Sequence, residues 1–264
     1  MARALITGCS SGFGRATAVE LKKRGYEVVA TARRPETLAD LDVEKRLALD
    51  VTDDASVSAA VASAGAIDVL VNNAGIGIGG PVELVPIAEV RRIFETNVFG
   101  PLRMMQAVLP QMRARGVGTI VNVSSVSGRI AAPLSGFYAA SKFALEAMSE
   151  ALHFEAGHFG IRTIVIEPGF FKTNISESHL DYGVDAPPYD ELAEITEKMS
   201  AQIGRDSAPG PEVVAAAIAD AVESPAPPLR VPVGTDAEMV LGVRATLDDA
   251  AFEKAMREFL NVDW

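Results

Sequence analysis

Tyr138 and Lys142 stand four residues apart in the sequence Tyr-Ala-Ala-Ser-Lys, which opens a longer helical pattern. This spacing places both side chains on one face of a helix. A tyrosine with a pKa of ~10 is a poor base at neutral pH, whereas a neighbouring ammonium stabilises the phenolate and lowers that pKa. The pair is therefore suited to acid/base catalysis, although the same spacing also arises on ordinary exposed helices.

A glycine-rich segment follows the first apolar run of the chain, residues 4–6, and precedes a helical pattern over residues 15–24. Its spacing, Gly-x-x-x-Gly-x-Gly, allows the backbone to turn tightly and to approach a pyrophosphate. The N-terminus of the following helix stabilises the charge of such a group. This context favours dinucleotide binding over a simple strand-to-helix turn. The predicted cofactor contacts in this segment are Gly8, Ser10, Ser11, Gly12, Phe13 and Gly14.

Two arginines, Arg33 and Arg34, follow Ala32 at the end of the second apolar run. An acidic residue at this point would accept hydrogen bonds from the adenosine ribose hydroxyls, but the chain has none there. A guanidinium pairs instead with a 2′-phosphate through charge-assisted bonds, so these residues predict NADP(H) rather than NAD(H). The alternative is an ordinary solvated pair of surface arginines.

Asn97 lies inside a long helical pattern, residues 87–115, and Pro101 follows four residues later. Proline has no N–H to donate to the carbonyl of Asn97, so we expect that carbonyl to bind an ordered water. The alternative is a kink in the helix without a chemical role.

Short apolar runs that are typical of strands alternate with longer helical patterns along most of the chain. The strand-like runs are at residues 4–6, 28–30, 47–49, 69–71, 119–123 and 163–166. This repeated alternation predicts an α/β fold with a doubly wound, Rossmann-like parallel sheet. We expect a single domain over residues 1–264, with a last strand at residues 229–231 and a C-terminal helix over residues 248–260.

The segment of residues 174–206 interrupts the alternation with two consecutive prolines, many acidic residues and an amphipathic helix. Because a long insertion in a compact domain is often a functional loop, we expect a mobile lid over an apolar substrate pocket. The alternative is a helix that packs permanently on the core. The apolar stripe of this helix is Leu192, Ile195, Met199 and Ile203, and the residues expected to face water are Glu191, Glu194 and Glu197.

Charge and composition argue against several classes of function. The chain has 24 Lys and Arg against 35 Asp and Glu, and its net charge of −11 repels a nucleic acid. The one cysteine, Cys9, fits a reducing cytoplasm, and we identify no export signal and no apolar stretch that would span a membrane. The histidines do not cluster at a metal-ligand spacing, so no metal site is expected.

Taken together, these motifs resemble those of the short-chain dehydrogenase/reductase family. The resemblance covers nearly the whole chain and depends on five motifs in the family's order and spacing: residues 7–14, Asn72-Asn73-Ala74-Gly75, Asn97, Ser125 and residues 138–142. It implies a catalytic set of Asn97, Ser125, Tyr138 and Lys142. In that set Ser125 binds the substrate oxygen, Lys142 also holds the nicotinamide ribose, and Asn97 anchors a water of the proton relay.

The resemblance also extends the predicted cofactor site. It implies that Asp50 and Val51 contact the adenine and that Asn73, Ala74 and Gly75 border the adenosine. The segment after the sixth strand would receive the nicotinamide carboxamide through Pro168, Gly169, Phe171 and Thr173, although Phe171 stands where the family commonly has Val or Ile. Many relatives pair the helices equivalent to residues 87–115 and 138–158, which implies a homodimer or homotetramer.

The sequence therefore predicts an enzyme that transfers a hydride between NADP(H) and an alcohol or carbonyl carbon of an apolar small molecule. The run of residues 141–146 is similar to that of family members acting on hydroxysteroids and retinoids, and aromatic ketones are further candidates. The alternative is a noncatalytic NADP(H)-binding sensor or regulator on the same fold. The intact catalytic set argues against this alternative.

Overall fold

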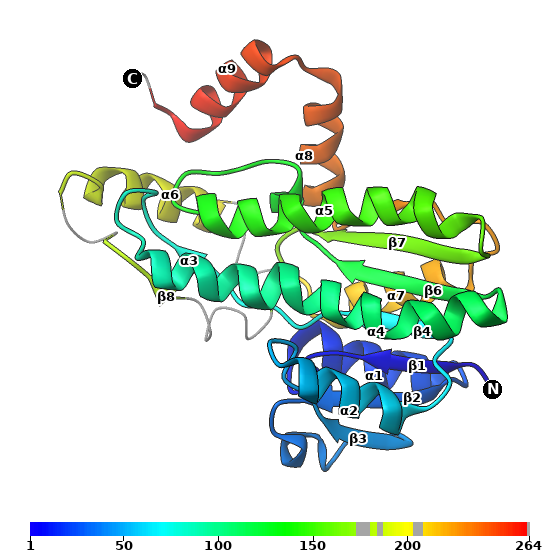
Figure 1. Cartoon of the computed structure of the whole chain (residues 1–264). Coiled ribbons are helices and arrows are strands. Elements are labelled where there is room, and N and C mark those ends of the chain that lie inside the picture. Colours follow the sequence, from blue (N-terminus) through cyan, green and yellow to red (C-terminus); the bar gives the residue numbers. More distant parts are fainter. Residues whose placement is uncertain (173–179, 184–186, 203–207, 263–264) are drawn as a thin grey trace.

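A parallel sheet forms the centre of the protein (Figure 1). The computed structural model describes residues 1–172, 180–183, 187–202 and 208–262. The sheet has seven strands in the order β3-β2-β1-β4-β6-β7-β9, and every pairing is parallel. The strands are β1 Arg3–Ile6, β2 Glu27–Ala32, β3 Lys45–Ala48, β4 Val69–Asn72, β6 Gly118–Val123, β7 Ile161–Pro168 and β9 Arg230–Val233.

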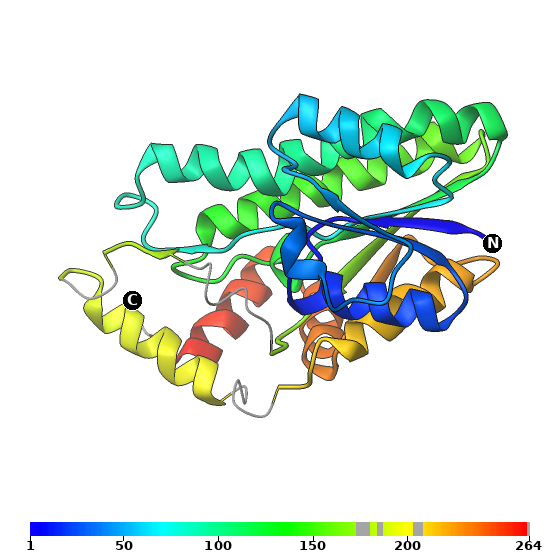
Figure 2. The ribbon, with the colours of Figure 1, turned by 90° about the horizontal axis from the view of Figure 1, so that it is seen from below.

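Helices cover both faces of this sheet, as Figures 1 and 2 show. Side chains of α1 and α7 pack with one set of strand residues, and those of α2, α4 and α5 pack with the other set. Within β1, for example, Ala4 and Ile6 join the first core and Leu5 joins the second. The helices are α1 Gly12–Lys23, α2 Asp54–Ala64, α3 Ile87–Phe94, α4 Gly100–Arg115, α5 Gly136–Gly157, α6 Asp190–Gln202, α7 Glu212–Glu223, α8 Thr235–Thr246 and α9 Asp249–Leu260.

Burial on both faces explains why the strands appear in the sequence as unbroken apolar runs. The doubly wound parallel fold predicted from those runs is confirmed. The third strand was expected at residues 47–49 and is observed as Lys45–Ala48, where the flanking residues are exposed and the apolar signal is weak. The strand order reverses between β1 and β4, and the carboxyl ends of these strands form the crevice in which open α/β sheets bind ligands.

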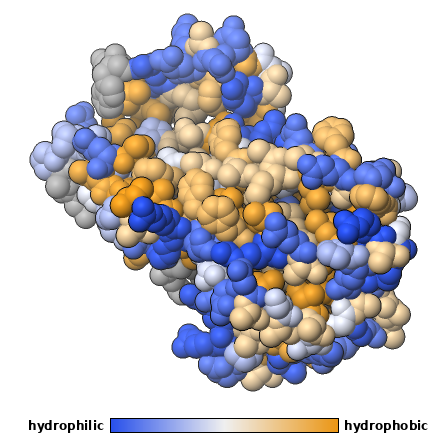
Figure 3. Space-filling model, viewed as in Figure 1, coloured by the Kyte–Doolittle hydropathy of each residue, from blue (hydrophilic) through white to orange (hydrophobic). Residues whose placement is uncertain are grey.

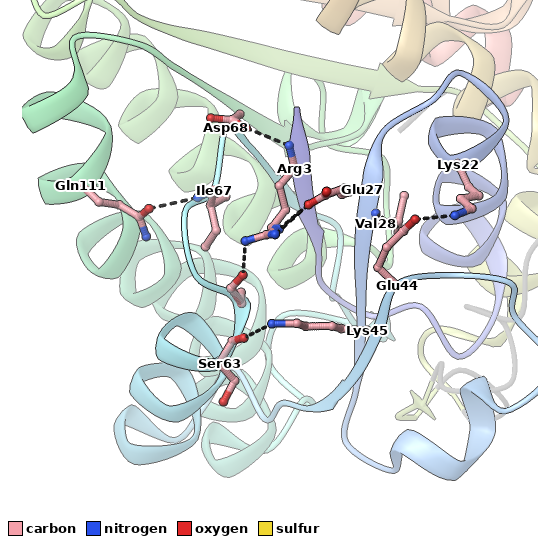
Figure 4. Close-up of polar contacts among 11 residues, drawn as sticks. Arg3, Lys22, Glu27, Val28, Glu44, Lys45, Ser63, Ile67, Asp68 and Gln111 are labelled. Carbon is pink, nitrogen blue, oxygen red and sulfur yellow. Dashed lines mark hydrogen bonds and ion pairs between the residues drawn. The ribbon is translucent and has the colours of Figure 1, made fainter. Parts of the chain in front are cut away.

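Polar contacts connect the sheet to its surroundings at the amino-terminal end of β1 and along β2 and β3 (Figure 4). The Arg3 guanidinium donates to the Glu27 carboxylate at 2.7 Å and to the carbonyl oxygen of Ala64 at 2.9 Å. The backbone N–H of Arg3 donates to the carboxylate of Asp68 at 2.8 Å. Glu44 accepts from the N–H of Val28 at 2.7 Å. These contacts lie at the amino-terminal end of the strands, so the carboxyl end of the sheet remains available for function.

The helix predicted over residues 87–115 is divided by a π-helical segment, η2, at Glu95–Phe99. The N–H of Gly100 donates to the carbonyl oxygen of Glu95, five residues earlier. Because Pro101 offers no N–H to the carbonyl of Asn97, the wider turn lies where the α-helical bond is missing. The expected interruption at Asn97 is present, and its form is a π-bulge, a feature that is frequent at functional sites.

The described part of the predicted lid contacts two other parts of the chain. A short strand β8, Leu180–Asp181, pairs in parallel with β5, Ile78–Gly79, and neither strand was expected from the sequence. Figure 2 shows α6 lying beside α9, and the two helices are in contact. Leu192 and Ile195 are partly buried and the three glutamates are exposed, which fits an amphipathic helix. That the apolar stripe faces a substrate pocket stays a prediction. Ile203 and the side chain of Met199 lie outside the described residues, and the mobility of a lid stays a prediction.

A buried amide chain ties the middle of the sheet to α5. The Asn72 amide donates to the side-chain oxygen of Asn122 at 2.8 Å, and the Asn122 amide donates to the hydroxyl of Ser149 at 2.8 Å. All three side chains are at most 3% exposed. Such buried groups are costly when one partner is removed, because the remaining donor stays dehydrated and unpaired.

We therefore predict that Asn122→Leu lowers the free energy of unfolding by about 2–3 kcal/mol, since it leaves the Asn72 amide without an acceptor. Ser149→Ala breaks only one of these two bonds and keeps the bond between Asn72 and Asn122, so it should cost less, about 1 kcal/mol. Urea unfolding of the two variants and the wild type measures both values. Equal costs for the two substitutions would contradict this account.

Candidate active site

Two loops at the carboxyl ends of β1 and β4 are held together by a small set of hydrogen bonds. The Thr7 hydroxyl accepts from the N–H groups of Asn73 at 3.0 Å and Ala74 at 2.9 Å. In return, the Asn73 amide donates to the carbonyl oxygens of Thr7 at 2.9 Å and Gly8 at 3.1 Å. The glycine-rich segment and the turn of residues 72–75 thus form one rigid unit at the reversal of strand order.

The glycines of this unit are required by close approach. Gly8 has φ +73°, and a Cβ on it would lie 2.9 Å from the Cα of Ala74. A Cβ on Gly14 would overlap the Asn73 amide and the carbonyl oxygen of Gly8. Helix α1 begins at Gly12, and its first turn, which lies wholly in the described part of the chain, carries no acidic residue. The residues present therefore fit a pyrophosphate at the helix N-terminus, as the sequence predicted.

Tyr138 and Ser125 meet at the carboxyl end of the neighbouring strands. Tyr138 lies in the first turn of α5, and Ser125 caps the short helix η3, Val126–Gly128, by accepting from the N–H of Ser127 at 3.1 Å. Burial raises the pKa of Tyr138, and the neighbouring Ser125 hydroxyl opposes that shift in part. At neutral pH the Tyr138 side chain is therefore a neutral phenol.

Lys142 is buried one helical turn after Tyr138, at 6% exposure. Its ammonium donates to the carbonyl oxygen of Val123 at 2.9 Å and lies 5.8 Å from the centre of the Tyr138 ring. Burial lowers the pKa of Lys142 to about 8, and the charge of Glu146 opposes this shift. The expectation that Lys142 lowers the Tyr138 pKa is not met in this structure, because burial dominates at the phenol and Lys142 is turned toward Val123.

Asn97 connects the π-bulge to the turn after β4 and to α5. Its side-chain oxygen accepts from the N–H of Ile76 at 2.9 Å, and its amide donates to the carbonyl oxygen of Ile76 at 3.0 Å and to the Ser141 hydroxyl at 3.1 Å. A Cβ on Gly75 would lie 3.4 Å from the Asn97 oxygen and 3.9 Å from the Lys142 nitrogen. The four residues of the predicted catalytic set are thus gathered in one region.

The predicted adenosine end of the site is formed by the loops after β2 and β3. Arg33 and Arg34 are exposed. Burial opposes the ionisation of Asp50, but hydrogen bonds from Thr52 and the nearby charge of Arg33 hold its pKa below the usual value. Val51 is buried and lies against Gly100, where a Cβ would come within 2.8 Å of it. Asp50 therefore lies near Arg33, and Val51 borders the start of α4.

The segment after β7 approaches the glycine-rich loop through an aromatic contact. Phe171 packs edge-to-face on Phe13, with the ring centroids 5.7 Å apart. The N–H of Phe170 donates to Asp236 of α8 at 2.7 Å, and Gly169 lies so close to the same carboxylate that it has no room for a side chain. Pro168 ends β7, whereas Thr173 lies outside the described residues.

Several residues at this site were not predicted from the sequence. Ser141 binds Asn97, Asp236 holds the loop after β7, and the buried Glu146 stands one turn beyond Lys142. Glu146 lay within the run of residues 141–146 that the sequence analysis singled out. No sequence pattern indicated a role for Asp236, because its contacts with residues 169–170 depend on how α8 packs in the tertiary structure.

Other groups in the described part of the chain suggest no additional chemistry. Burial raises the pKa of Cys9 to about 12, and its thiol contacts the carbonyl oxygen of Ile6, so it behaves as a core residue. No cluster of three or more potential metal ligands occurs among the described residues. None of the described helices is long and apolar enough to cross a membrane.

The fold and the loops at its switch point define a Rossmann-like protein whose residues fit a dinucleotide. The family model described as short chain dehydrogenase matches residues 2–181, and the chain belongs to this family. Its members are oxidoreductases that act on alcohol or carbonyl groups with a nicotinamide cofactor.

Individual relatives agree with this assignment. The chain is 38% identical to 3-ketodihydrosphingosine reductase of Bacteroides thetaiotaomicron, over 97% of this chain and 96% of that protein. It is 37% identical to human retinol dehydrogenase 8, over 86% and 79% of the two chains. The solved structure of a short chain dehydrogenase from Burkholderia cenocepacia in complex with NADP is similar at a TM-score of 0.79, with 28% identity and 97% of each chain covered.

The contact between the two loops predicts a specific effect of Gly14→Ala. The added methyl group meets backbone on one side, so the loop must shift, and we expect at least about a tenfold loss of affinity for the cofactor and about 1–3 kcal/mol of lost stability. Cofactor fluorescence and thermal melting measure the two effects. Gly157→Ala is the control, because a Cβ there meets nothing within 4 Å, and equal behaviour of the two variants would refute the argument.

Proposed function

We propose that the protein is an NADP(H)-dependent oxidoreductase that reduces the carbonyl group of an apolar small molecule, or oxidises the corresponding alcohol. The observation that carries the proposal is the gathering of Ser125, the neutral phenol of Tyr138 and the buried Lys142, one helical turn after Tyr138, at the carboxyl end of the sheet. This arrangement provides two hydroxyl groups for one substrate oxygen and a cation to support proton transfer.

The proposed roles of the side chains follow from their positions. When bound, the nicotinamide cofactor supplies or accepts the hydride. Ser125 holds the substrate oxygen, and the Tyr138 phenol donates its proton to that oxygen during reduction. Lys142 supports the phenolate that remains, and Asn97 fixes the turn beside Lys142. The main-chain carbonyl of Asn97, to which Pro101 offers no N–H, would bind a relay water.

An apolar substrate is supported by the surroundings of Tyr138. Its ring packs against a cluster that is centred on Ile78, Val85 and Ile93 and also contains Ile76, Val90, Phe94, Phe137 and Tyr182. A carbonyl group that reaches Tyr138 therefore lies beside apolar side chains. Two relatives, a ketodihydrosphingosine reductase and a retinol dehydrogenase, have names that specify largely apolar substrates. We infer a substrate of that class, such as a long-chain ketone, a retinoid or a steroid.

A homodimer or homotetramer stays a prediction. Figure 3 shows apolar side chains across the middle of the face formed by α4 and α5. The exposed aromatic residues of this region include Phe99, Phe143 and Phe154, which are 44%, 44% and 75% exposed. Exposed aromatic residues on neighbouring helices are typical of a surface that a second subunit covers.

We predict that Tyr138→Phe loses at least about a thousandfold in kcat with ketone substrates while its affinity for NADPH changes less than about threefold. The ring and its packing remain, but the transferable proton is lost. Steady-state NADPH oxidation with a panel of retinal, ketosteroids and aromatic ketones gives the rates, and cofactor fluorescence gives the affinity. Turnover within a few-fold of wild type would remove Tyr138 from the mechanism, and a wild type inactive on the whole panel would favour the sensor hypothesis.

We predict a preference for NADP(H) that depends on Arg33. Arg33→Ala should lower kcat/KM for NADPH about tenfold or more and leave kcat/KM for NADH nearly unchanged, because only NADPH carries the 2′-phosphate. Lys45→Ala on the exposed strand β3 removes the same charge and serves as the control. Equal kcat/KM for the two cofactors in the wild type would contradict the assignment.

A further inference from the structure

A buried group of charged side chains lies behind Lys142, on the side away from Tyr138. Glu146 follows Lys142 by four residues on α5, so both side chains lie on one helix face. Glu146 is only 4% exposed, and one of its carboxylate oxygens accepts from the Arg230 guanidinium at 2.9 Å. The other oxygen has no hydrogen-bond partner among the described residues.

The environment of Glu146 is closed by η3. A Cβ on Gly128 would lie 2.6 Å from the Ser124 hydroxyl oxygen and 2.9 Å from the Cγ of Glu146. The Ser124 hydroxyl is also buried and has no partner in the described part of the chain. Lys142 donates to the carbonyl oxygen of Val123, the residue before Ser124. The unpaired carboxylate oxygen is therefore enclosed near the main chain to which the ammonium is bound.

The other charges around Glu146 come from four elements. Arg230 of β9 also contacts Glu150 of α5 and lies 3.7 Å from Glu167 of β7. Arg129, which follows η3, contacts Glu167 at 3.1 Å. Burial and the charge of Glu146 both raise the pKa of Glu167. With Lys142, the group contains three cations and three acidic side chains. Arg129 and Arg230 each contact a carboxylate directly, whereas Lys142 forms no ion pair within this group.

We propose that Glu146 is a positioning residue for Lys142, because its enclosed carboxylate supplies the negative charge that keeps the Lys142 side chain an ammonium. This inference depends on the proposed function only for its consequence, which is support of the Tyr138 phenolate. A buried ammonium is unfavourable unless a charge of opposite sign lies nearby. Burial acts to remove the proton of Lys142, and the charge of Glu146 acts against it.

The structure also offers a different role, in which Glu146 only braces α5 against β9 through Arg230. Glu146→Gln separates the two roles, since glutamine keeps the shape and an oxygen that accepts from Arg230 but removes the charge. Glu150→Gln is the matched control. It removes a carboxylate from the same arginine at an exposed site, with a side chain that is 53% exposed.

The experiment is an NMR titration of the full-length protein that contains ¹³Cε-labelled lysine, with the Lys142 signal assigned by its loss in Lys142→Met. We expect the Lys142 midpoint to fall by about one pH unit in Glu146→Gln and to change by less than about 0.3 in Glu150→Gln. An unchanged midpoint in Glu146→Gln would overturn the proposal and leave the bracing role. This readout needs no substrate, so it is independent of the proposed function.

A second measurement uses turnover. With a midpoint one unit lower, the ammonium fraction falls about fivefold at pH 8 and by less than about 1.2-fold at pH 6, and the alkaline limb of kcat/KM should move accordingly. A shifted titration with an unmoved pH profile would support Glu146 and count against Lys142 in the proposed mechanism. If Glu146→Gln fails to fold, the ¹³Cδ signal of Glu146 in the wild type provides the test. It should report a carboxylate throughout pH 6–9 with an inflection at the Lys142 midpoint, and a protonated Glu146 at pH 7 would overturn the proposal.

Discussion

The hydrogen bonds between Thr7 and residues 73–74 determine where the candidate site lies, because they join the loops of β1 and β4 at the reversal of strand order. Without this contact the two loops would diverge, since the helices that follow their strands cover opposite faces of the sheet. The contact leaves no space for a side chain at Gly14 and forces Gly8 into a left-handed backbone conformation. The glycines of the loop are therefore a consequence of two loops packed against each other, and the space left beside them fits a pyrophosphate.

A second constraint is the burial of polar side chains near these two loops, since each of them needs hydrogen-bond partners inside the protein. Asn97 reaches the turn after β4 and α5 with three hydrogen bonds, and it does so from a π-bulge that Pro101 helps to create. Asn72 and Asn122 form a separate chain of hydrogen bonds that ends at Ser149 of α5. These buried hydrogen bonds link β4 to α5 through Asn122 of β6 and set the distance between the two elements. The first turn of α5, which carries Tyr138, is positioned by that distance.

The sheet was predicted correctly from the sequence, because strand burial is a local property of the chain. The four residues of the catalytic set came from the resemblance to a family; the structure brings them into one region, and their roles stay a proposal. The sequence did not predict β5 and β8, whose two-residue pairing has no periodicity, or α8, whose Asp236 acts on a loop 66 residues away. The interruption of the helical pattern over residues 87–115 was expected from the missing N–H of Pro101, but its form, a π-helical turn rather than a kink, was not. The strength of burial at Tyr138 and Lys142 also depends on distant elements, and so the direction of their pKa shifts was not available from the Tyr-Ala-Ala-Ser-Lys spacing.

Burial acts on Tyr138 and Lys142 in opposite directions, and both effects favour the uncharged group. If Lys142 were a neutral amine, the Tyr138 phenol could donate its proton, but no nearby charge would stabilise the phenolate that remains. The charge that makes the pair useful must therefore come from outside it, and Glu146 is the carboxylate that stands closest in sequence on the same helix face. On this view the ammonium and the buried carboxylate behind it act in both directions of the reaction. Carbonyl reduction leaves a phenolate at Tyr138, which the ammonium stabilises, and alcohol oxidation begins from that same phenolate.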